Sequence, residues 1–247
     1  MHSKSLPSEQ VRKVRLYWHL TYFIVFLWVI KAAEELFHFS LHSLGVYPGK
    51  LEGLIGVLTA PLIHGDWEHL ANNSFSMILL GALTIYGYVN STYRAIGVIW
   101  IVSGVGVWLL GRESYHFGAS GLTHGLFYFL FIAAILRRDK RSIALMLVAV
   151  FMYGSMVLGV LPWDPKISFE AHLFGAIGGG LGAFWFARHE PKPLEKRYHW
   201  EMEDDLDDED PYWLPEHQQQ SYQHDIDEQT NRRDKIITEI FNTDERR

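Results

Sequence analysis

Two residues of this sequence could together carry out nucleophilic chemistry. Ser120 lies where a polar loop enters a long apolar run, and His172 opens another apolar run 52 residues later. A serine hydroxyl is a weak nucleophile until a neighbouring base takes its proton, and a neutral imidazole is the usual base. Polar side chains in membrane-spanning segments need a partner or a function, because lipid offers them no hydrogen bonds. We therefore predict that Ser120 and His172 form a catalytic dyad.

A serine that attacks a carbonyl group also needs hydrogen-bond donors for the oxyanion that forms. The backbone N–H groups at the start of the helix that Ser120 opens have no partner within that helix, so they can serve as donors. His69 and Asn73 lie four residues apart, which puts them on one face of an earlier helix, and they are expected to complete the oxyanion hole. Glu170 precedes His172 by two residues and would point elsewhere on the helix, so no acidic third member is predicted.

Glycines occur where two of these helices would have to approach each other. Gly175 and Gly179 have the G-x-x-x-G spacing on the helix that His172 opens. Small residues at this spacing let two membrane helices pack closely, which would bring the imidazole to the serine hydroxyl. Gly118 and Gly121 flank the candidate nucleophile and leave the backbone around it uncrowded.

Six apolar stretches must position these residues. Of the 247 residues, 49% are hydrophobic, and each stretch has or approaches the roughly 20 residues that a membrane-spanning helix needs. A segment between the first two stretches, around residues 51–58, has the pattern of an interfacial helix. The predicted fold class is an all-α polytopic membrane protein with a bundle of six transmembrane helices. The expected spans are residues 16–37, 69–88, 94–110, 120–136, 142–161 and 170–187.

Charge divides the chain into a membrane domain, residues 1–188, and an acidic cytoplasmic tail, residues 189–247. The first part carries 14 Lys and Arg against 10 Asp and Glu, and the second carries 8 against 18. The tail is expected to be mostly disordered, and its acidity argues against nucleic acid or anionic lipid as a partner. It is either a solvated segment without a partner or a carrier of a short amphipathic docking helix. The apolar residues of that helix would be Ile236, Ile237, Ile240 and Phe241.

Basic residues indicate how the six stretches are oriented. Arg and Lys residues precede the first stretch and follow the second, fourth and sixth, so with six spans they fall on one side. The positive-inside rule then places both termini in the cytoplasm. The second, fourth and sixth stretches would begin on the outer side, which puts His69, Ser120 and His172 at similar depth. The loop charges and the short tail suit an integral protein of a bacterial inner membrane.

In these features the chain resembles the rhomboid intramembrane serine proteases. The resemblance covers residues 16–188 and rests on Gly-Ala-Ser-Gly at 118–121, on Ala-His-Leu-Phe-Gly at 171–175 followed by Gly179, and on the segment 64–73. It implies a six-helix bundle with a water-filled cavity that is open to the outer side. It also implies that no cofactor is needed.

The resemblance implies a role for each candidate residue. Ser120 would be the nucleophile, His172 the general base, and His69 and Asn73 the oxyanion stabilisers. The implied substrates are single-pass membrane proteins, which are cut in or beside the segment that spans the lipid bilayer. The function expected on this basis is that of an intramembrane serine endopeptidase.

The chain departs from the family pattern at two places. Many members carry a Trp-Arg pair in the first loop, and residues 39–68 contain none. Four residues after the nucleophile, an aromatic side chain often supports the catalytic imidazole, but here the residue is His124. Its ring could stack as well as an aromatic one, or it could titrate and make activity sensitive to pH. His64 is expected to be structural, ordering the first loop through hydrogen bonds.

Two other functions compete with the protease reading. A catalytically silent relative would bind membrane-protein helices and would not need the Ser–His pair that this chain keeps. A small-solute transporter would use the same polar groups as ligands, but the two halves show no inverted repeat of the kind such folds often have. No metal site is predicted, because cysteine is absent and His38 and His42, one turn after Glu34 and Glu35, suit an interfacial position better. The sequence leaves the oligomeric state open.

Overall fold

The structure is a computed structural model that describes residues 8–163, 167–191, 215, 218, 224–233 and 235. Its contacts divide the chain into two units, Met1–Pro193 and Leu194–Arg247. In the second unit, residues 224–233 are helical. The docking helix predicted around residues 236–241 lies outside the described residues, and so does most of the acidic tail.

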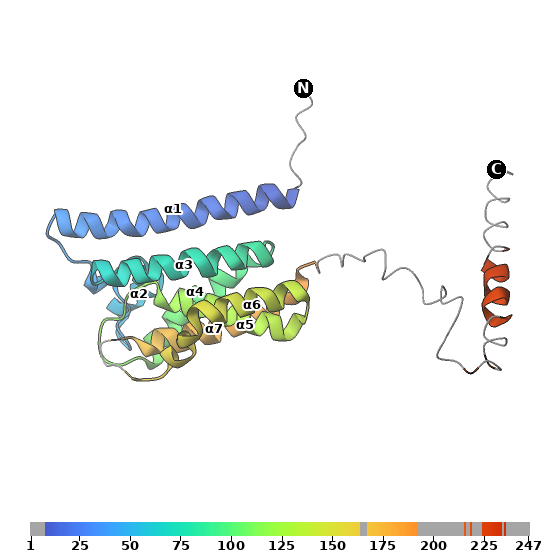
Figure 1. The fold of residues 1–247 in the computed structure, drawn as a ribbon. Helices are drawn as coiled ribbons and strands as arrows, with labels where there is room; N and C mark the ends of the chain where they lie inside the picture. Colours follow the sequence, from blue (N-terminus) through green and yellow to red (C-terminus); the bar gives the residue numbers. More distant parts are fainter. Residues whose placement is uncertain are drawn as a thin grey trace, which may run out of the picture. The chain divides into compact units, whose positions relative to one another are not determined.

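The described residues of the first unit form a bundle of helices in which α1 packs along α3 (Figure 1). The connection between these two helices is made of short helical turns. In chain order the elements are α1 (Ser8–Leu36), η1 (His42–Leu44), η2 (Leu51–Ile55), α2 (Gly56–Thr59), η3 (Ala60–Leu62), α3 (Trp67–Gly87), α4 (Thr92–Leu110), α5 (Ser120–Arg137), α6 (Lys140–Tyr153), η4 (Gly154–Val160), α7 (Phe169–Phe186) and η5 (Ala187–His189), where η denotes a 3-10 helix.

Four helices in the described part of the chain are long and apolar enough to cross a membrane: α1, α4, α5, and α6 together with η4. The helices α3 and α7 have similar lengths, 21 and 18 residues. They are not among these four. The first turn of each carries polar side chains, including His69 in α3 and His172 in α7.

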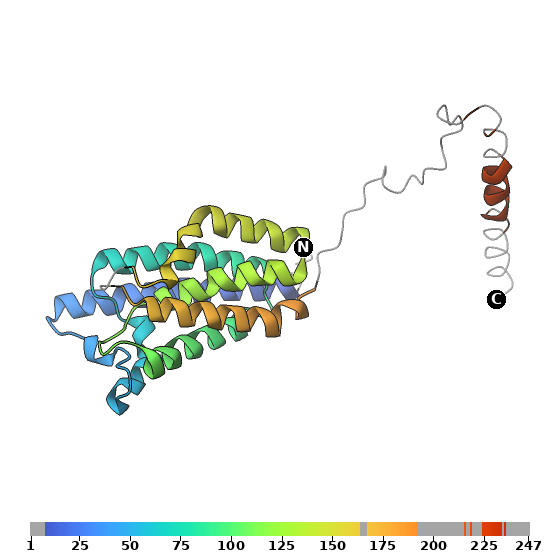
Figure 2. The ribbon, with the colours of Figure 1, turned by 90° about the horizontal axis from the view of Figure 1, so that it is seen from below.

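The helix α7 lies between α4 and α5 (Figure 2). One face of α7 meets α4 at two glycines. A Cβ atom on Gly178 would lie 2.9 Å from the Cα atom of Ile99, and one on Gly182 would lie 3.4 Å from the Cα atom of Ala95. Small residues let membrane helices come this close and gain packing contacts.

Buried aromatic side chains fill the interior, whereas apolar side chains cover the outside of the bundle. Tyr88, Phe127 and Phe129 are fully buried. In contrast, α6 buries few of its side chains, and Phe151 on this helix is 88% exposed. A helix that is apolar on its exposed face is suited to contact with lipid.

The buried Arg137 links the C-terminal ends of α5 and α7. It lies at the end of the bundle opposite Ser120 and His172, which belong to the first turns of these helices. Its guanidinium donates hydrogen bonds to the carbonyl oxygen of Glu190 at 2.7 Å and to the carboxylate of Asp139 at 2.8 Å. Desolvation would raise the pKa of Asp139, but hydrogen bonds from Ser142 and Arg137 outweigh it and hold this pKa below its ordinary value. The Glu190 carboxylate in turn accepts a hydrogen bond from the backbone N–H of Ser91, just before α4.

Helix ends differ from the prediction at two places. The first helix begins at Ser8 and not at residue 16, because the charged stretch before the apolar run continues the same helix and forms a Glu9–Lys13 ion pair at i, i+4. The predicted span 142–161 is α-helical only as far as Tyr153. It continues from Gly154 as the tighter helix η4.

Candidate active site

The candidate catalytic side chains lie in the first two turns of three helices. Asp66 caps α3, and its carboxylate accepts a hydrogen bond from the backbone N–H of His69 at 2.7 Å. Ser168 caps α7, four residues before His172. The helix α5 begins at Ser120 itself. Because the three helices begin at the same end of the bundle, these residues are brought close to one another.

One cavity of about 600 Å³ is lined by residues from the starts of α3, α5 and α7. It brings together all four residues that the sequence singled out for the reaction: Ser120, His172, His69 and Asn73. Much of the remaining lining is also polar, which suits water better than lipid. These other lining residues include Gly65, Asp66, Glu68, Ser76, Thr123 and Met156.

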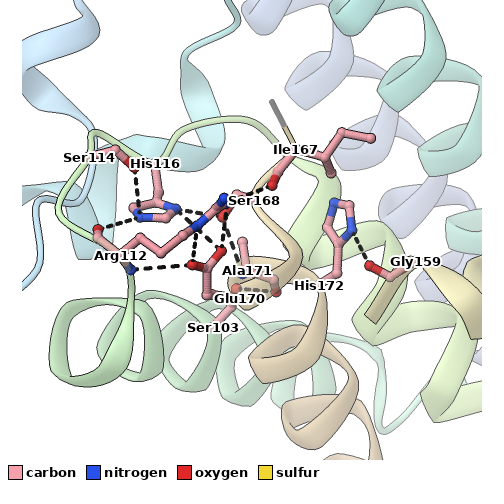
Figure 3. Close-up of polar contacts among 10 residues, drawn as sticks. All are labelled: Ser103, Arg112, Ser114, His116, Gly159, Ile167, Ser168, Glu170, Ala171 and His172. Carbon is pink, nitrogen blue, oxygen red and sulfur yellow. Dashed lines mark hydrogen bonds and ion pairs between the residues drawn. The ribbon is translucent and has the colours of Figure 1, made fainter. Parts of the chain in front are cut away.

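The hydrogen bond that His172 makes defines its neutral tautomer. Its Nδ1 atom lies 2.9 Å from the carbonyl oxygen of Gly159 (Figure 3). A carbonyl oxygen can only accept, so Nδ1 carries the proton and Nε2 keeps a free lone pair. Among the described residues, no hydrogen bond joins this ring to the hydroxyl of Ser120. Catalytic hydrogen bonds are often long until a substrate binds.

Gly118 leaves room for two donor side chains beside Ser120. Its φ of +115° lies in the region that favours glycine. A Cβ atom here would lie 2.6 Å from Cε1 of His69 and 3.6 Å from the amide nitrogen of Asn73. Asn73 is only 6% exposed, and its amide nitrogen has no hydrogen-bond partner among the described residues. A buried donor without a partner, placed beside Gly118 and therefore near Ser120, is suited to stabilise an oxyanion.

Contact between backbones brings α5 and α7 together. A Cβ atom on Gly175 would lie 2.1 Å from the carbonyl oxygen of Gly121, and one on Gly179 would lie 2.1 Å from the carbonyl oxygen of Gly125. Any side chain at these positions would therefore push the two helices apart. The G-x-x-x-G spacing of α7 thus sets the separation between the helix of Ser120 and the helix of His172.

The Rhomboid domain family matches residues 51–189, from the start of η2 to the end of η5. The chain belongs to the rhomboid family. Uncharacterized proteins of Mycobacterium tuberculosis and Mycobacterium bovis are each 33% identical to it over 179 residues, which cover 69% of this chain and 75% of theirs. An uncharacterized protein of Mycobacterium leprae is 30% identical over 180 residues, covering 69% of this chain and 71% of that protein. No solved structure matches the chain.

In this rhomboid domain, His124 contacts both the imidazole of His172 and the backbone of Ser120. Its ring stacks on that of His172, with the ring centroids 3.7 Å apart. Its Nδ1–H donates to the carbonyl oxygen of Ser120 at 2.8 Å. A Cβ atom on Gly159 would lie 2.6 Å from its Nε2 atom, so η4 also closes on this ring. Three elements therefore fix the plane of His124.

His64 holds the loop that precedes Ser120. The residue is 1% exposed, and its Nε2 atom accepts a hydrogen bond from the backbone N–H of Ala119 at 3.3 Å. Its ring also meets the ring of His69 edge-on, with centroids 5.1 Å apart. Burial lowers the pKa of His64 to about 3, so the ring is neutral at pH 7 and can act as this acceptor.

A second polar cluster of the rhomboid domain was not predicted from the sequence. Arg112, which follows α4, forms an ion pair with Glu170 of α7 at 2.6 Å, and His116 and Ser168 join the cluster (Figure 3). Glu170 binds Arg112, whereas the imidazole of His172 binds the carbonyl oxygen of Gly159. The sequence shows only that Arg112 and Glu170 are opposite charges at the edges of two apolar runs. This pattern alone does not predict that the two residues pair.

His38 and His42, the two histidines considered for a metal site, lie in the first loop without other potential metal ligands gathered around them among the described residues. His42 stacks on Phe117, with ring centroids 4.6 Å apart and planes inclined by 15°. His38 adopts a φ of +54°, at the end of the turn that follows α1. Among the residues that the structure describes, no three potential metal ligands come together. The contact with Phe117 links the first loop to the loop that leads to Ser120.

Proposed function

We propose that this rhomboid protein is an intramembrane serine endopeptidase that cleaves single-pass membrane proteins in or beside their transmembrane segment. Ser120 is the nucleophile and His172 is the general base. The observation that carries the proposal is the tautomer of His172. Because the Gly159 carbonyl holds Nδ1–H, Nε2 is left as the proton acceptor in a cavity that Ser120 also lines.

In the proposed reaction, Oγ of Ser120 attacks the carbonyl carbon of the scissile peptide bond while Nε2 of His172 takes the hydroxyl proton. Negative charge develops on the carbonyl oxygen and is stabilised by His69, Asn73 and the free N–H groups at the start of α5. When the tetrahedral intermediate collapses, the imidazolium gives its proton to the leaving amine. Water, activated by the same nitrogen, then hydrolyses the acyl-enzyme. The scheme uses no cofactor.

We also propose that six helices cross the bilayer, with α3 and α7 added to the four that are long and apolar enough. Both are long enough to do so. The basic residues at 137–141, between α5 and α6, then lie on the cytoplasmic side together with both termini. The cavity lies on the outer side, where water can reach it. The mycobacterial relatives agree with a bacterial inner membrane.

The experiment that tests the proposed activity is labelling of the full-length, detergent-purified protein with a fluorophosphonate probe. The serine oxygen forms a bond to phosphorus, fluoride leaves, and the base takes the hydroxyl proton, so the probe detects an activated serine without any knowledge of the substrate. We expect the wild type to be labelled, and Ser120→Ala and His172→Ala to remain unlabelled.

Ser76→Ala is the matched control for this labelling. Ser76 lines the same cavity, but its hydroxyl donates a hydrogen bond to the carbonyl oxygen of Asn72 within its own helix, at 2.9 Å. Labelling should therefore persist in Ser76→Ala. Labelling that also persists in Ser120→Ala, or a folded wild type that is not labelled, would contradict the proposal. The second result would favour a silent rhomboid protein that binds membrane helices.

Cleavage itself can be tested without choosing a substrate in advance. New protein N-termini in the membrane fraction of bacterial cells that express the wild type are compared with those in cells that express Ser120→Ala. We expect the termini unique to the wild type to map within or next to transmembrane segments of single-pass proteins. Termini confined to soluble proteins would argue against the proposed substrate class.

A further inference from the structure

We propose that the ion pair between Glu170 and Arg112 positions the general base relative to the nucleophile without touching either. The inference rests on the proposed function, because it concerns the same Ser120 and His172. Glu170 belongs to the first turn of α7, and Arg112 stands near the start of the loop that leads to α5. The ion pair therefore joins the two segments that carry the reacting groups.

The contact between Arg112 and Glu170 is bidentate, and it joins a side chain that is 41% exposed to a buried carboxylate. The Nε atom of Arg112 donates to one carboxylate oxygen at 2.6 Å, and Nη2 donates to the other at 3.2 Å (Figure 3). The backbone N–H of Arg112 adds a third hydrogen bond at 3.2 Å, and Nη2 also donates to the carbonyl oxygen of Ile167 at 2.7 Å. Glu170 is 4% exposed. A guanidinium bound in this way fixes orientation as well as distance.

His116 and Ser168 extend this link to the N-cap of α7. The Nε2 atom of His116 lies 3.0 Å from the carbonyl oxygen of Arg112, so Nε2–H donates and the neutral ring accepts at Nδ1. The hydroxyl of Ser168, 2.6 Å from Nδ1, is then the donor. Its oxygen accepts a hydrogen bond from the backbone N–H of Ala171. The protons of this chain can therefore be assigned without conflict.

The loop between the ion pair and the nucleophile is anchored on its other side. His116 forms two backbone hydrogen bonds with Val46, both of 2.9 Å, and the N–H of Gly118 donates to the carbonyl oxygen of Ala60 at 2.8 Å. A loop held at these points has little freedom to absorb a displacement. Loss of the ion pair would therefore shift the start of α7 relative to the loop, and with it His172.

Glu170 acts as a positioning residue and not as a third member of a catalytic triad. The Nδ1 atom of His172, which a triad carboxylate would hold, is bound by the carbonyl oxygen of Gly159. The effect of Glu170 on the reaction is therefore one of placement. A misplacement of about 1 Å can lower an enzymatic rate about 100-fold.

The test measures fluorophosphonate labelling of the full-length protein in detergent, with the rate resolved into its maximum and the half-saturating probe concentration. Glu170→Gln preserves the size of the side chain and removes its charge. We expect the maximal rate to fall about 10- to 100-fold, with little change in the half-saturating concentration. Arg112→Lys keeps the charge but not the bidentate geometry, so a smaller fall is expected, and this variant decides the matter if Glu170→Gln does not fold.

A double variant that combines Glu170→Gln and Arg112→Lys shows whether the two residues act through their shared contact or independently of each other. If Glu170 and Arg112 act through one contact, the variant with both substitutions should be labelled no more slowly than Glu170→Gln alone, because the link is already broken. A rate reduced by the product of the two single effects would overturn the inference. Melting temperatures are measured for every variant, so that the rates refer to folded protein.

Asp139→Asn is the matched control. Asp139 forms an ion pair of 2.8 Å with the buried Arg137, but at the opposite end of α5. We expect its melting temperature to fall while the maximal labelling rate stays at the wild-type value. Wild-type rates in both Glu170→Gln and Arg112→Lys would overturn the inference and leave the proposed function standing. Absence of labelling in folded wild type would overturn the proposed function, and this inference with it.

Discussion

The imidazole planes of His124 and His172 are inclined by only 9° and overlap face to face. Each ring is oriented by a hydrogen bond from its own Nδ1, His124 to the carbonyl oxygen of Ser120 and His172 to the carbonyl oxygen of Gly159. The stack therefore links the helix turn of the proposed nucleophile to the proposed base. It leaves Nε2 of His172 as the atom that can take a proton.

Substitution of His124 distinguishes the stack from the hydrogen bond. His124→Phe keeps a flat ring and loses the bond to the Ser120 carbonyl, so we expect a small fall in the fluorophosphonate labelling rate. His124→Ala removes the ring that supports His172, and we expect a fall of about 100-fold. Labelling of His124→Ala at the wild-type rate would show that the stack does not position the base.

The dependence of the labelling rate on pH tests whether His124 titrates. When His172 takes the proton of the nucleophile, a protonated His124 would place a second positive charge against it, and like charges this close repel. Burial of the ring against a second imidazole disfavours a charge on His124, so we expect the acid sides of the wild-type and His124→Phe profiles to coincide. Loss of activity at a higher pH in the wild type than in His124→Phe would show that His124 titrates.

Gly179→Ala should force α5 and α7 apart. The added methyl group would lie 2.1 Å from the carbonyl oxygen of Gly125, a backbone atom that cannot rotate away. Overpacking of this kind typically costs about 1–3 kcal/mol, so the melting temperature of the purified protein should fall. Gly180→Ala is the control, because no atom lies within 4 Å of its added methyl group. Equal melting temperatures for the two variants would contradict the close approach.

The residues at the helix starts could be singled out from the sequence because two signals coincide there. Ser120 and His172 are polar residues at the edges of apolar runs, and the basic loops give those edges a common side. The same pattern favoured six spans, of which four helices meet the requirement for length and apolar character. The remaining two are the helices whose polar first turns line the cavity, so six spans stay a prediction.

The contacts that hold the proposed base could not be predicted, because they depend on how distant loops meet. Arg112 and Glu170 are 58 residues apart, and each is a charged residue at the edge of an apolar run, which a membrane protein can equally leave in water. The partner of His172 is a backbone carbonyl group, that of Gly159, which no pattern of side chains reveals. Its position follows from the change of α6 into η4, where the sequence predicts one continuous helix.

Asn73→Ala should impair the reaction more than binding. Its amide nitrogen is buried without a partner among the described residues, so the donor is free for an oxyanion that exists only after attack. Loss of one such donor typically lowers kcat about 10²–10³-fold. The measurement is kcat and KM for a cleaved transmembrane substrate, and KM should change little. Asn72→Ala, one residue earlier and exposed, is the control, and a similar loss of kcat in both variants would contradict the role of Asn73.

Arg137→Leu should destabilise the domain and spare the proposed site. The substitution removes the guanidinium that donates to the carboxylate of Asp139 and to the carbonyl oxygen of Glu190, and breaking a buried ion pair typically costs about 3–5 kcal/mol. Because the pKa of Asp139 in the folded protein lies below its ordinary value, the contribution of this pair is complete at neutral pH. It is lost only as the pH falls through the folded-state pKa. A melting temperature at pH 7 equal to that of the wild type would contradict the role of Arg137.

His64→Gln should make the stability of the domain less sensitive to acid. The pKa of His64 is about 3 in the folded protein, against 6.5 for a histidine in water, so below pH 6.5 the unfolded chain binds a proton that the folded chain does not bind. The stability that the neutral ring contributes is therefore complete above pH 6.5 and declines as the pH falls towards 3, by roughly 1 kcal/mol per pH unit. A glutamine amide oxygen can still accept the hydrogen bond of Ala119 but does not titrate. We expect His64→Gln to melt below the wild type at pH 7.5 and the difference to shrink by pH 5, whereas a constant difference would mean that His64 is not held neutral by burial.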